Sequence, residues 1–222
     1  MNFAHIVTHN LKTYSGNLES VLTLFINAQT DDERNEMLGY LKHISSGFTG
    51  TVKNLTDIVA VQAKENMQRE LINLKNLIDH CVESLAVDVK KTGALMINNV
   101  PADANLFYNP AYLDSIILNF MTNAIKYRHP GRNPVVTMDA QMAGDKLVFK
   151  IQDNGMGIDL DKHGSKLFGM YNTFHRNADA KGIGLYITKY QVESMGGCIE
   201  VESEVGFGTT FRVFFPIVKL PE

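Results

Sequence analysis

The sequence predicts an α+β protein in which a helical hairpin precedes a domain of mixed helices and strands. Three observations carry this prediction. Apolar residues recur every three or four positions in the first 60 residues, which is the spacing of one stripe along an α-helix. All six prolines lie between Pro101 and Pro221, so the first part of the chain lacks this helix breaker. Beyond residue 130, β-rich runs are separated by glycine-containing turns, a pattern typical of β-hairpins.

Length and composition are those of a folded protein with two domains. Of the 222 residues, 45% are hydrophobic and 20% are charged, which argues against disorder. The net charge of −3 gives no attraction for a polyphosphate backbone, so a general nucleic-acid binder is disfavoured. No apolar run approaches the ~18 residues of a membrane span, and two cysteines are too few for a disulfide scaffold. We expect a cytoplasmic protein without membrane contact through this segment.

The hairpin is predicted from two apolar stripes that flank a polar break at residues 29–32. The stripes consist of Phe3, Val7, Leu11, Tyr14, Leu18, Val21 and Phe25, and of Met37, Leu41, Ile44, Phe48, Val52, Leu55 and Val59. A lone hairpin has too little interior to bury both stripes, so we expect a homodimer that forms a four-helix bundle. The alternative is that the second domain covers them. We assign the hairpin to residues 1–65 and the second domain to residues 66–222.

The second domain is expected to place helices on one side of a mostly antiparallel sheet. Helices are predicted at 74–89, after Asn109-Pro110, where proline suits the first helical turn, and at 183–194. Strands are predicted at 94–98, 134–142, 146–152, 198–203 and 209–216. The turn at 143–145 joins one predicted strand pair, and the turn at 206–208 joins another.

Two glycine-rich segments of this domain are candidates for ligand binding. Segment 153–157 (DNGMG) follows a predicted strand, so it places a carboxylate beside glycines at which the backbone can approach a ligand closely. Segment 181–185 (KGIGL) opens a predicted helix, whose free N–H groups can hold phosphate oxygens. Each pattern is weak alone, and a tight loop is the alternative. Neither is a Walker P-loop, because no Gly-Lys-Ser/Thr follows the spaced glycines.

A third polar segment lies on the predicted helix after Pro110. Asn119, Asn123, Lys126 and Tyr127 share one helix face, while apolar residues take the other. Mg²⁺ prefers oxygen ligands, so an amide carbonyl beside nucleotide phosphates is a reasonable partner, and Lys126 can neutralise phosphate charge. The alternative is a solvated polar face.

Together these segments resemble the conserved boxes of the sensor histidine kinases. Residues 119–127 resemble the N box, 153–157 the G1 box, 168–174 the F box, 182–185 the G2 box and 206–210 the last glycine box. The resemblance covers nearly the whole chain and implies the Bergerat ATP-binding fold, which gyrase-type and chaperone ATPases share. It also implies that a segment from about 161 to 181 is a mobile lid over the triphosphate.

The resemblance implies roles for individual residues. Asn123 is expected to coordinate Mg²⁺, and Asp153 to accept a hydrogen bond from the adenine amino group. The expected nucleotide-binding residues are Asn119, Asn123, Lys126, Tyr127, Asp153, Gly155, Gly157, Lys181, Gly182, Gly184, Leu185 and Thr209.

In the predicted hairpin, residues 9–13 (HNLKT) resemble the H box, whose histidine accepts the γ-phosphoryl group. Helix phase independently places His9 roughly 160° from the apolar stripe, so its side chain should be exposed. A histidine of ordinary pKa is at least half neutral at pH 7 and has a lone pair for attack. His5 lies one turn earlier, which is also a metal-binding geometry, but no third ligand accompanies the pair.

Two residues of the predicted H box region depart from the family pattern. Asn10 stands where the family usually has Glu or Asp; its amide cannot take the proton, but its carbonyl can orient the ring N–H, so we expect a slower kinase. Tyr14 replaces the family's proline, which predicts a straighter first helix. Thr13 takes the position that, in this family, helps to place a water for phosphatase action.

The leading hypothesis is a kinase that uses ATP and Mg²⁺, phosphorylates His9 and passes the group to an aspartate on a response-regulator receiver domain. The alternatives are a Bergerat-fold ATPase, which leaves the H box unexplained, and a degenerate kinase that acts as a scaffold, against which Asn123 and Asp153 argue. We expect either an excised catalytic core or a small kinase that takes its signal from a partner. Any membrane-bound sensor portion would lie outside this chain.

Overall fold

The structure is a computed structural model that describes residues 3–62, 68–169 and 183–217. For residues 3–12, 43, 46–47, 50–51 and 53–62 it describes the backbone and not the side chains. The chain divides into two compact units, residues 1–64 and 65–222, and each is described by itself. The predicted domain boundary after residue 65 falls outside the described residues and stays a prediction.

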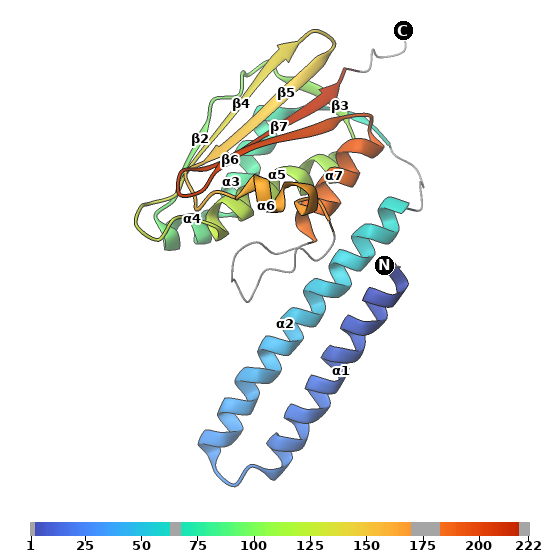
Figure 1. Cartoon of the computed structure of the whole chain (residues 1–222), viewed down its shortest axis with the longest axis vertical. Helices are drawn as coiled ribbons and strands as arrows, with labels where there is room; N and C mark the ends of the chain where they lie inside the picture. Colours follow the sequence, from blue (N-terminus) through green and yellow to red (C-terminus); the bar gives the residue numbers. More distant parts are fainter. Residues whose placement is uncertain (1–2, 63–67, 170–182, 218–222) are drawn as a thin grey trace. The chain divides into compact units, whose positions relative to one another are not determined.

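The first unit is a hairpin of two long helices, α1 (Phe3–Asn27) and α2 (Asp31–Gln62), as predicted (Figure 1). α1 runs without interruption through Tyr14, whose ring packs edge-on against Phe48 of α2 with 5.9 Å between ring centroids. With no proline at position 14, α1 is thus continuous there, and its predicted straightness stays a prediction.

A capping box starts α2 and ends the turn between the helices. The backbone N–H of Glu33 donates to the Thr30 hydroxyl, and the Glu33 carboxylate accepts the N–H groups of Gln29 and Thr30. These hydrogen bonds hold the pKa of Glu33 below its usual value. The polar break predicted at residues 29–32 is thus a specific helix start.

No described side chain of the hairpin is buried. The stripe residues Val21, Phe25, Met37, Leu41 and Ile44 are only partly covered. Large apolar side chains that stay exposed are Leu18, Leu22, Leu24, Ile26, Leu38, Tyr40, Phe48 and Val52. The two helices alone therefore leave much of their apolar surface uncovered.

The second unit is built on a five-stranded sheet with the strand order β2-β4-β5-β7-β6 (Figure 1). β2 lies parallel to β4, and the other neighbours are antiparallel, which confirms the predicted mostly antiparallel sheet. The strands are β2 (Leu95–Asn98), β4 (Val135–Ala143), β5 (Lys146–Asp153), β6 (Cys198–Glu204) and β7 (Gly208–Pro216).

A second, two-stranded sheet was not predicted. It pairs β1 (Glu70–Asn73) with β3 (Asn105–Tyr108) in antiparallel fashion. The two strands are short and pair with each other across a long stretch of chain, so no connecting turn marks them as a hairpin in the sequence.

The helices α3, α5 and α7 lie on one face of the larger sheet (Figure 1). The helices are α3 (Leu74–Ser84), α4 (Ala86–Thr92), α5 (Pro110–Lys126), the short α6 (Leu160–His163) with the 3₁₀ turn Gly164–Lys166, and α7 (Gly184–Ser194). α5 begins as predicted, with Asn109 capping the N–H of Tyr112 and Pro110 in the first turn. The single helix predicted at 74–89 is wrong, because the chain leaves helical geometry at the buried Leu85 and restarts as α4.

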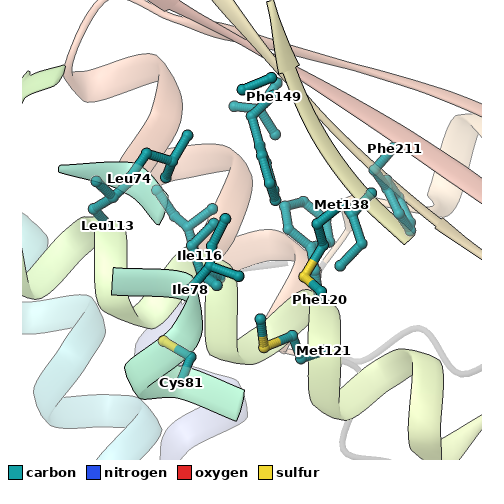
Figure 2. Packing of buried hydrophobic residues seen from close by; sticks show 14 of the residues in the cluster. Leu74, Ile78, Cys81, Leu113, Ile116, Phe120, Met121, Met138, Phe149 and Phe211 are labelled. Atoms are coloured by element: carbon teal, nitrogen blue, oxygen red, sulfur yellow. The ribbon is translucent and has the colours of Figure 1, made fainter. Parts of the chain in front are cut away.

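The core of the unit lies between these helices and the sheet (Figure 2). Phe120 of α5 packs on Phe211 of β7 with 4.8 Å between ring centroids, and Met138 and Phe149 come from the neighbouring strands. This packing fixes α5 against β5 and β7, whose ends carry the polar segments singled out in the sequence.

Candidate nucleotide-binding site

Asn119 and Asn123 lie one turn apart on α5 and belong to one chain of hydrogen bonds. Asn123 Nδ2 donates to Asn119 Oδ1 at 3.4 Å, and Asn119 Nδ2 donates to the hydroxyl of Thr188 in α7 at 2.6 Å. Thr188 is buried, so it is a fixed acceptor. These hydrogen bonds use the side-chain nitrogen of Asn123 and not its side-chain carbonyl oxygen. The oxygen is the atom that a cation would bind.

Gly184, the first residue of α7, lies directly against Asn119. A Cβ at this position would come within 3.0 Å of Asn119 Cγ, so only glycine permits the approach. The first turn of α7, whose backbone N–H groups have no partner within the helix, therefore lies next to the asparagines of α5. Leu185 packs against the core below them, whereas Lys181 and Gly182 lie outside the described residues.

Asp153 ends β5 with one carboxylate oxygen anchored. Oδ1 accepts the backbone N–H of Gly155 at 2.8 Å and that of Thr209 at 3.3 Å, while Oδ2 accepts no hydrogen bond from the described residues. Burial raises the pKa of Asp153, and the two hydrogen bonds and the charge of Arg132 partly offset this effect. The site thus holds a carboxylate in one orientation with an oxygen left for an amino donor.

The glycines of the 153–157 loop face protein rather than open space. A Cβ at Gly155 would lie 2.6 Å from the carbonyl oxygen of Tyr127, and one at Gly157 would lie 2.6 Å from the carbonyl carbon of Glu204. Gly157 also has a positive φ of 68°. Both glycines therefore serve close packing of the loop between the end of α5 and the β6–β7 turn.

Thr209, Lys126 and Tyr127 support the same region. The hydroxyl of Thr209 lies 2.9 Å from that of Ser203, and its N–H holds Asp153, so its described contacts are structural. Lys126 Nζ lies 5.7 Å from the centre of the Tyr127 ring, and the Tyr127 carbonyl accepts the N–H of Met156 at 2.9 Å. Burial raises the pKa of Tyr127, which keeps its phenol neutral.

Two residues that contact this site were missed in the sequence. Arg132, in the loop between α5 and β4, donates to backbone carbonyls of the 153–157 loop and of the β6–β7 turn. An arginine in a polar loop gives no sequence signal that separates it from a surface residue. Thr188 does leave a signal, because it lies one helical turn after Gly184 and so shares its face.

The structure describes only some of the residues predicted for the H box and the lid. His9 and Asn10 belong to α1, but their side chains lie outside the described residues, so the predicted exposure of His9 stays a prediction. Thr13 is exposed on the same helix. Of the predicted lid, the described residues up to 169 include α6 and a 3₁₀ turn, and Phe168 lies 5.5 Å from Lys189 Nζ. The rest of the lid lies outside the described residues.

A cation bound in this site would take most of its ligands from a bound nucleotide and from water. Within the described residues, no cluster of three or more His, Cys, Asp or Glu side chains can hold a metal ion. Mg²⁺ commonly keeps several waters and binds through substrate phosphates and few protein oxygens. The carbonyl oxygen of Asn123 therefore fits a Mg²⁺ ion that enters with a nucleotide.

Comparison with known proteins decides the family. The family model described as "Histidine kinase-, DNA gyrase B-, and HSP90-like ATPase" matches residues 108–219. The chain belongs to this family. The matched range runs from the end of β3 to just beyond β7, so it contains α5, the 153–157 loop and α7.

Relatives along the whole chain are sensor proteins. The sensor protein RprX of Bacteroides fragilis is 25% identical over 98% of this chain and 44% of its own length. The sensor protein SrrB of Staphylococcus aureus is 27% identical over all of this chain and 38% of its own length. The chain thus spans less than half the length of these relatives. Among the described helices, none combines the length and the apolar character that crossing a membrane requires.

Solved histidine kinases share the fold. The structure of histidine kinase ThkA in complex with the response regulator TrrA matches with a TM-score of 0.74, at 16% identity, over 97% of this chain and 60% of that chain. Full-length ShkA in complex with AMPPNP matches with a TM-score of 0.70, at 19% identity, over 99% of this chain and 46% of that chain. These matches confirm the predicted fold, a helical part followed by a Bergerat-type domain. The family model and the sensor-protein relatives bear out the resemblance to the catalytic core of sensor histidine kinases.

Proposed function

We propose that this chain is the core of a two-component sensor histidine kinase that transfers the γ-phosphoryl group of ATP to His9 and then to an aspartate of a response-regulator receiver domain. One observation carries the proposal. An ATPase-family unit that holds Asn123 and Asp153 in fixed orientations follows a helical hairpin that bears His9. Neither an ATPase nor a scaffold needs both parts.

In this proposal Asp153 binds the adenine of the nucleotide, and the polar end of α5 binds its phosphates. Asp153 Oδ2 accepts a hydrogen bond from the adenine amino group, because Oδ1 already accepts two hydrogen bonds from backbone N–H groups. Asn119, Asn123, Lys126 and Tyr127, together with residues 181–185 and the start of α7, surround the phosphates. Mg²⁺ bound with the triphosphate supplies charge neutralisation there, and Asn123 offers it the carbonyl oxygen.

The transfer needs a neutral His9. One ring nitrogen attacks the γ-phosphorus, so that an N–P bond forms while the P–O bond to ADP breaks and ADP leaves. The Asn10 carbonyl holds the N–H of the other ring nitrogen. In the second step an aspartate oxygen of the receiver domain attacks the same phosphorus and the N–P bond breaks. The ThkA–TrrA complex, solved with a response regulator, supports this class of partner.

The hairpin is proposed to pair with a second copy of the chain. Its described apolar side chains are half-covered or exposed, and two such hairpins bury them as a four-helix bundle. The kinase is therefore proposed to act as a homodimer.

Labelling with γ-labelled ATP and Mg²⁺ tests the proposal. The label should be acid-labile and alkali-stable, as a phosphoramidate is, and His9→Gln should abolish it while nucleotide affinity stays near that of the native chain. His5→Gln, one turn away on the same helix, is the matched control and should keep the label. Label that persists in His9→Gln, or ATP hydrolysis without any label, would favour an ATPase instead.

Thr13 is proposed to orient a water that hydrolyses the phosphorylated receiver domain. Thr13→Ala should then keep autophosphorylation and slow the dephosphorylation of a phosphorylated receiver, measured by loss of label over time. An unchanged dephosphorylation rate would remove Thr13 from this role.

A further inference from the structure

Arg132 joins two segments that are about fifty residues apart in the sequence. Its Nε donates to the carbonyl of Asn154 at 2.7 Å, and its Nη2 donates to that of Gly155 at 3.0 Å. The same Nη2 approaches the carbonyls of Gly206 at 2.6 Å and Phe207 at 3.3 Å. One guanidinium therefore bridges the 153–157 loop and the β6–β7 turn.

The bridged segments are those that orient Asp153. Gly155, which donates its N–H to Asp153 Oδ1, lies in the loop, and Thr209, the second donor, follows the turn by two residues. Between the loop and the turn themselves, one direct backbone bond is described, from the N–H of Gly206 to the carbonyl of Met156 at 2.7 Å. Arg132 thus supplies most of the cross-linking hydrogen bonds beside this carboxylate.

Arginine suits this position because its planar fork carries five donors, so it can satisfy several carbonyls at once. Hydrogen bonds from a charged donor are stronger than neutral ones. A lysine at the same place has one point of attachment, and its three donors cannot span both segments in the same fixed plane.

We propose that Arg132 is a positioning residue for adenine recognition, which holds Asp153 in place by cross-linking the 153–157 loop to the β6–β7 turn. This inference rests on the proposed function, since it assigns Arg132 to the nucleotide site of that kinase. Arg132 itself does not contact the base. It acts through the two backbone donors that fix Asp153 Oδ1 and leave Oδ2 for the amino group.

A second effect of Arg132 is electrostatic. Burial raises the pKa of Asp153, and the positive charge of Arg132 opposes this change. Among the described residues, Arg132 is the charged side chain that acts on Asp153 in this way. Removing the charge should raise this pKa further, so the carboxylate would lose its proton at a higher pH.

Three variants separate the effects. Arg132→Gln removes the charge and the fork, Arg132→Lys keeps the charge, and Arg212→Gln removes an equal charge on β7, where Arg212 pairs with Glu202. The first measurement is hydrogen exchange of residues 154–157 and 205–209 in the nucleotide-free protein. The second is the affinity for Mg²⁺ and a non-hydrolysable ATP analogue between pH 4 and pH 8.

Arg132→Gln should speed exchange in both segments, weaken nucleotide binding about tenfold, and move the acid limb of the binding profile to higher pH. Arg132→Lys should speed exchange and weaken binding but keep the acid limb near that of the native chain. Exchange and binding in Arg132→Gln equal to those in Arg212→Gln would overturn the inference. A native chain that binds no nucleotide would instead refute the proposed function, and the exchange data would still decide whether Arg132 cross-links the two segments.

Discussion

The carboxylate of Asp153 is half-buried, and burial raises its pKa although two N–H groups and Arg132 act against it. A raised pKa means that the folded chain binds this proton more tightly than the unfolded chain does. The ordinary pKa of an aspartate, 3.8, applies to the unfolded chain. The contribution of Asp153 to the free energy of unfolding therefore falls as the pH rises from 3.8 through the higher pKa of the folded chain. At neutral pH the ionised group destabilises the fold relative to its protonated form, which points to a role other than stability.

Asp153→Asn should therefore separate stability from binding. The amide oxygen still accepts the N–H groups of Gly155 and Thr209, so the melting temperature at pH 7 should equal or exceed that of the native chain. This advantage should vanish well below pH 3.8, where residue 153 is neutral in the folded and unfolded states of both chains. Affinity for an ATP analogue should fall at least tenfold. Asp139→Asn, on β4, is the control for the lost charge, and calorimetry measures both quantities. Nucleotide affinity unchanged in Asp153→Asn would place the adenine elsewhere.

Thr188 sets the orientation of both asparagines on α5, because it accepts the amide of Asn119, which in turn accepts that of Asn123. Thr188→Val removes the acceptor at nearly constant volume and should weaken Mg²⁺-dependent nucleotide binding by roughly 3- to 10-fold. Binding in the presence of EDTA should change less, since the cation is the group that Asn123 serves. Thr188→Ser should restore the native values. Equal losses with and without Mg²⁺ would show a general packing defect instead.

At the scale of elements, the contact between α5 and α7 builds the phosphate end of the site. Gly184 lets the start of α7 reach Asn119, and Thr188 secures the contact one turn later. Leu113, Ile116 and Phe120 of α5 are buried in the core. The glycine contact and this hydrogen bond thus add to the apolar packing of Ile187 and Val192 in positioning α7.

Gly184→Ala tests this contact. The new methyl group would overlap the Asn119 amide, so the free energy of unfolding should fall by about 1–3 kcal/mol and nucleotide binding should be lost. Gly39→Ala, in α2, is the matched control, because a Cβ there meets nothing within 4 Å. That change should stabilise the helix by about 0.5–1 kcal/mol. Thermal unfolding and the binding of an ATP analogue are measured for both variants. If Gly184→Ala behaved like Gly39→Ala in both measurements, the contact between α5 and α7 would not have this role.

The long elements of this chain were predictable from the sequence, because periodicity and caps mark them locally. The Asn109-Pro110 start of α5 and the stripes of the hairpin are examples. The strands β1 and β3 were not predicted, since they pair with each other across a long stretch of chain and no turn in the sequence marks them as a hairpin. In the candidate site, the motifs singled out Asn123 and Asp153, whose roles stay predictions. Arg132 was missed because its partners are backbone carbonyls, which leave no trace in residue types.

At the scale of the molecule, the two units present different surfaces. The second unit buries a continuous apolar core of its own between its helices and its larger sheet. The hairpin has no buried described residue, and its capping box and aromatic contact fix the two helices without covering their apolar sides. Exposed apolar patches of this kind mark association surfaces. Association of two hairpins through these apolar surfaces would bring two copies of α1, and so two His9 residues, into one bundle.

Leu18→Glu is the sharpest test of that association. Leu18 belongs to the stripe of α1 and is 47% exposed in the single hairpin, so a charge there is tolerated in a monomer but not inside a four-helix bundle. Light scattering should give the native chain twice its mass of 24.8 kDa and the variant the monomer mass. Val87→Glu, in α4 at a side chain that is 79% exposed, should stay dimeric. Helicity and nucleotide affinity should be unchanged in both, because the nucleotide site lies in the other unit. A native chain that is monomeric at micromolar concentration, or a Leu18→Glu variant that remains dimeric, would mean that the apolar stripes are covered in another way.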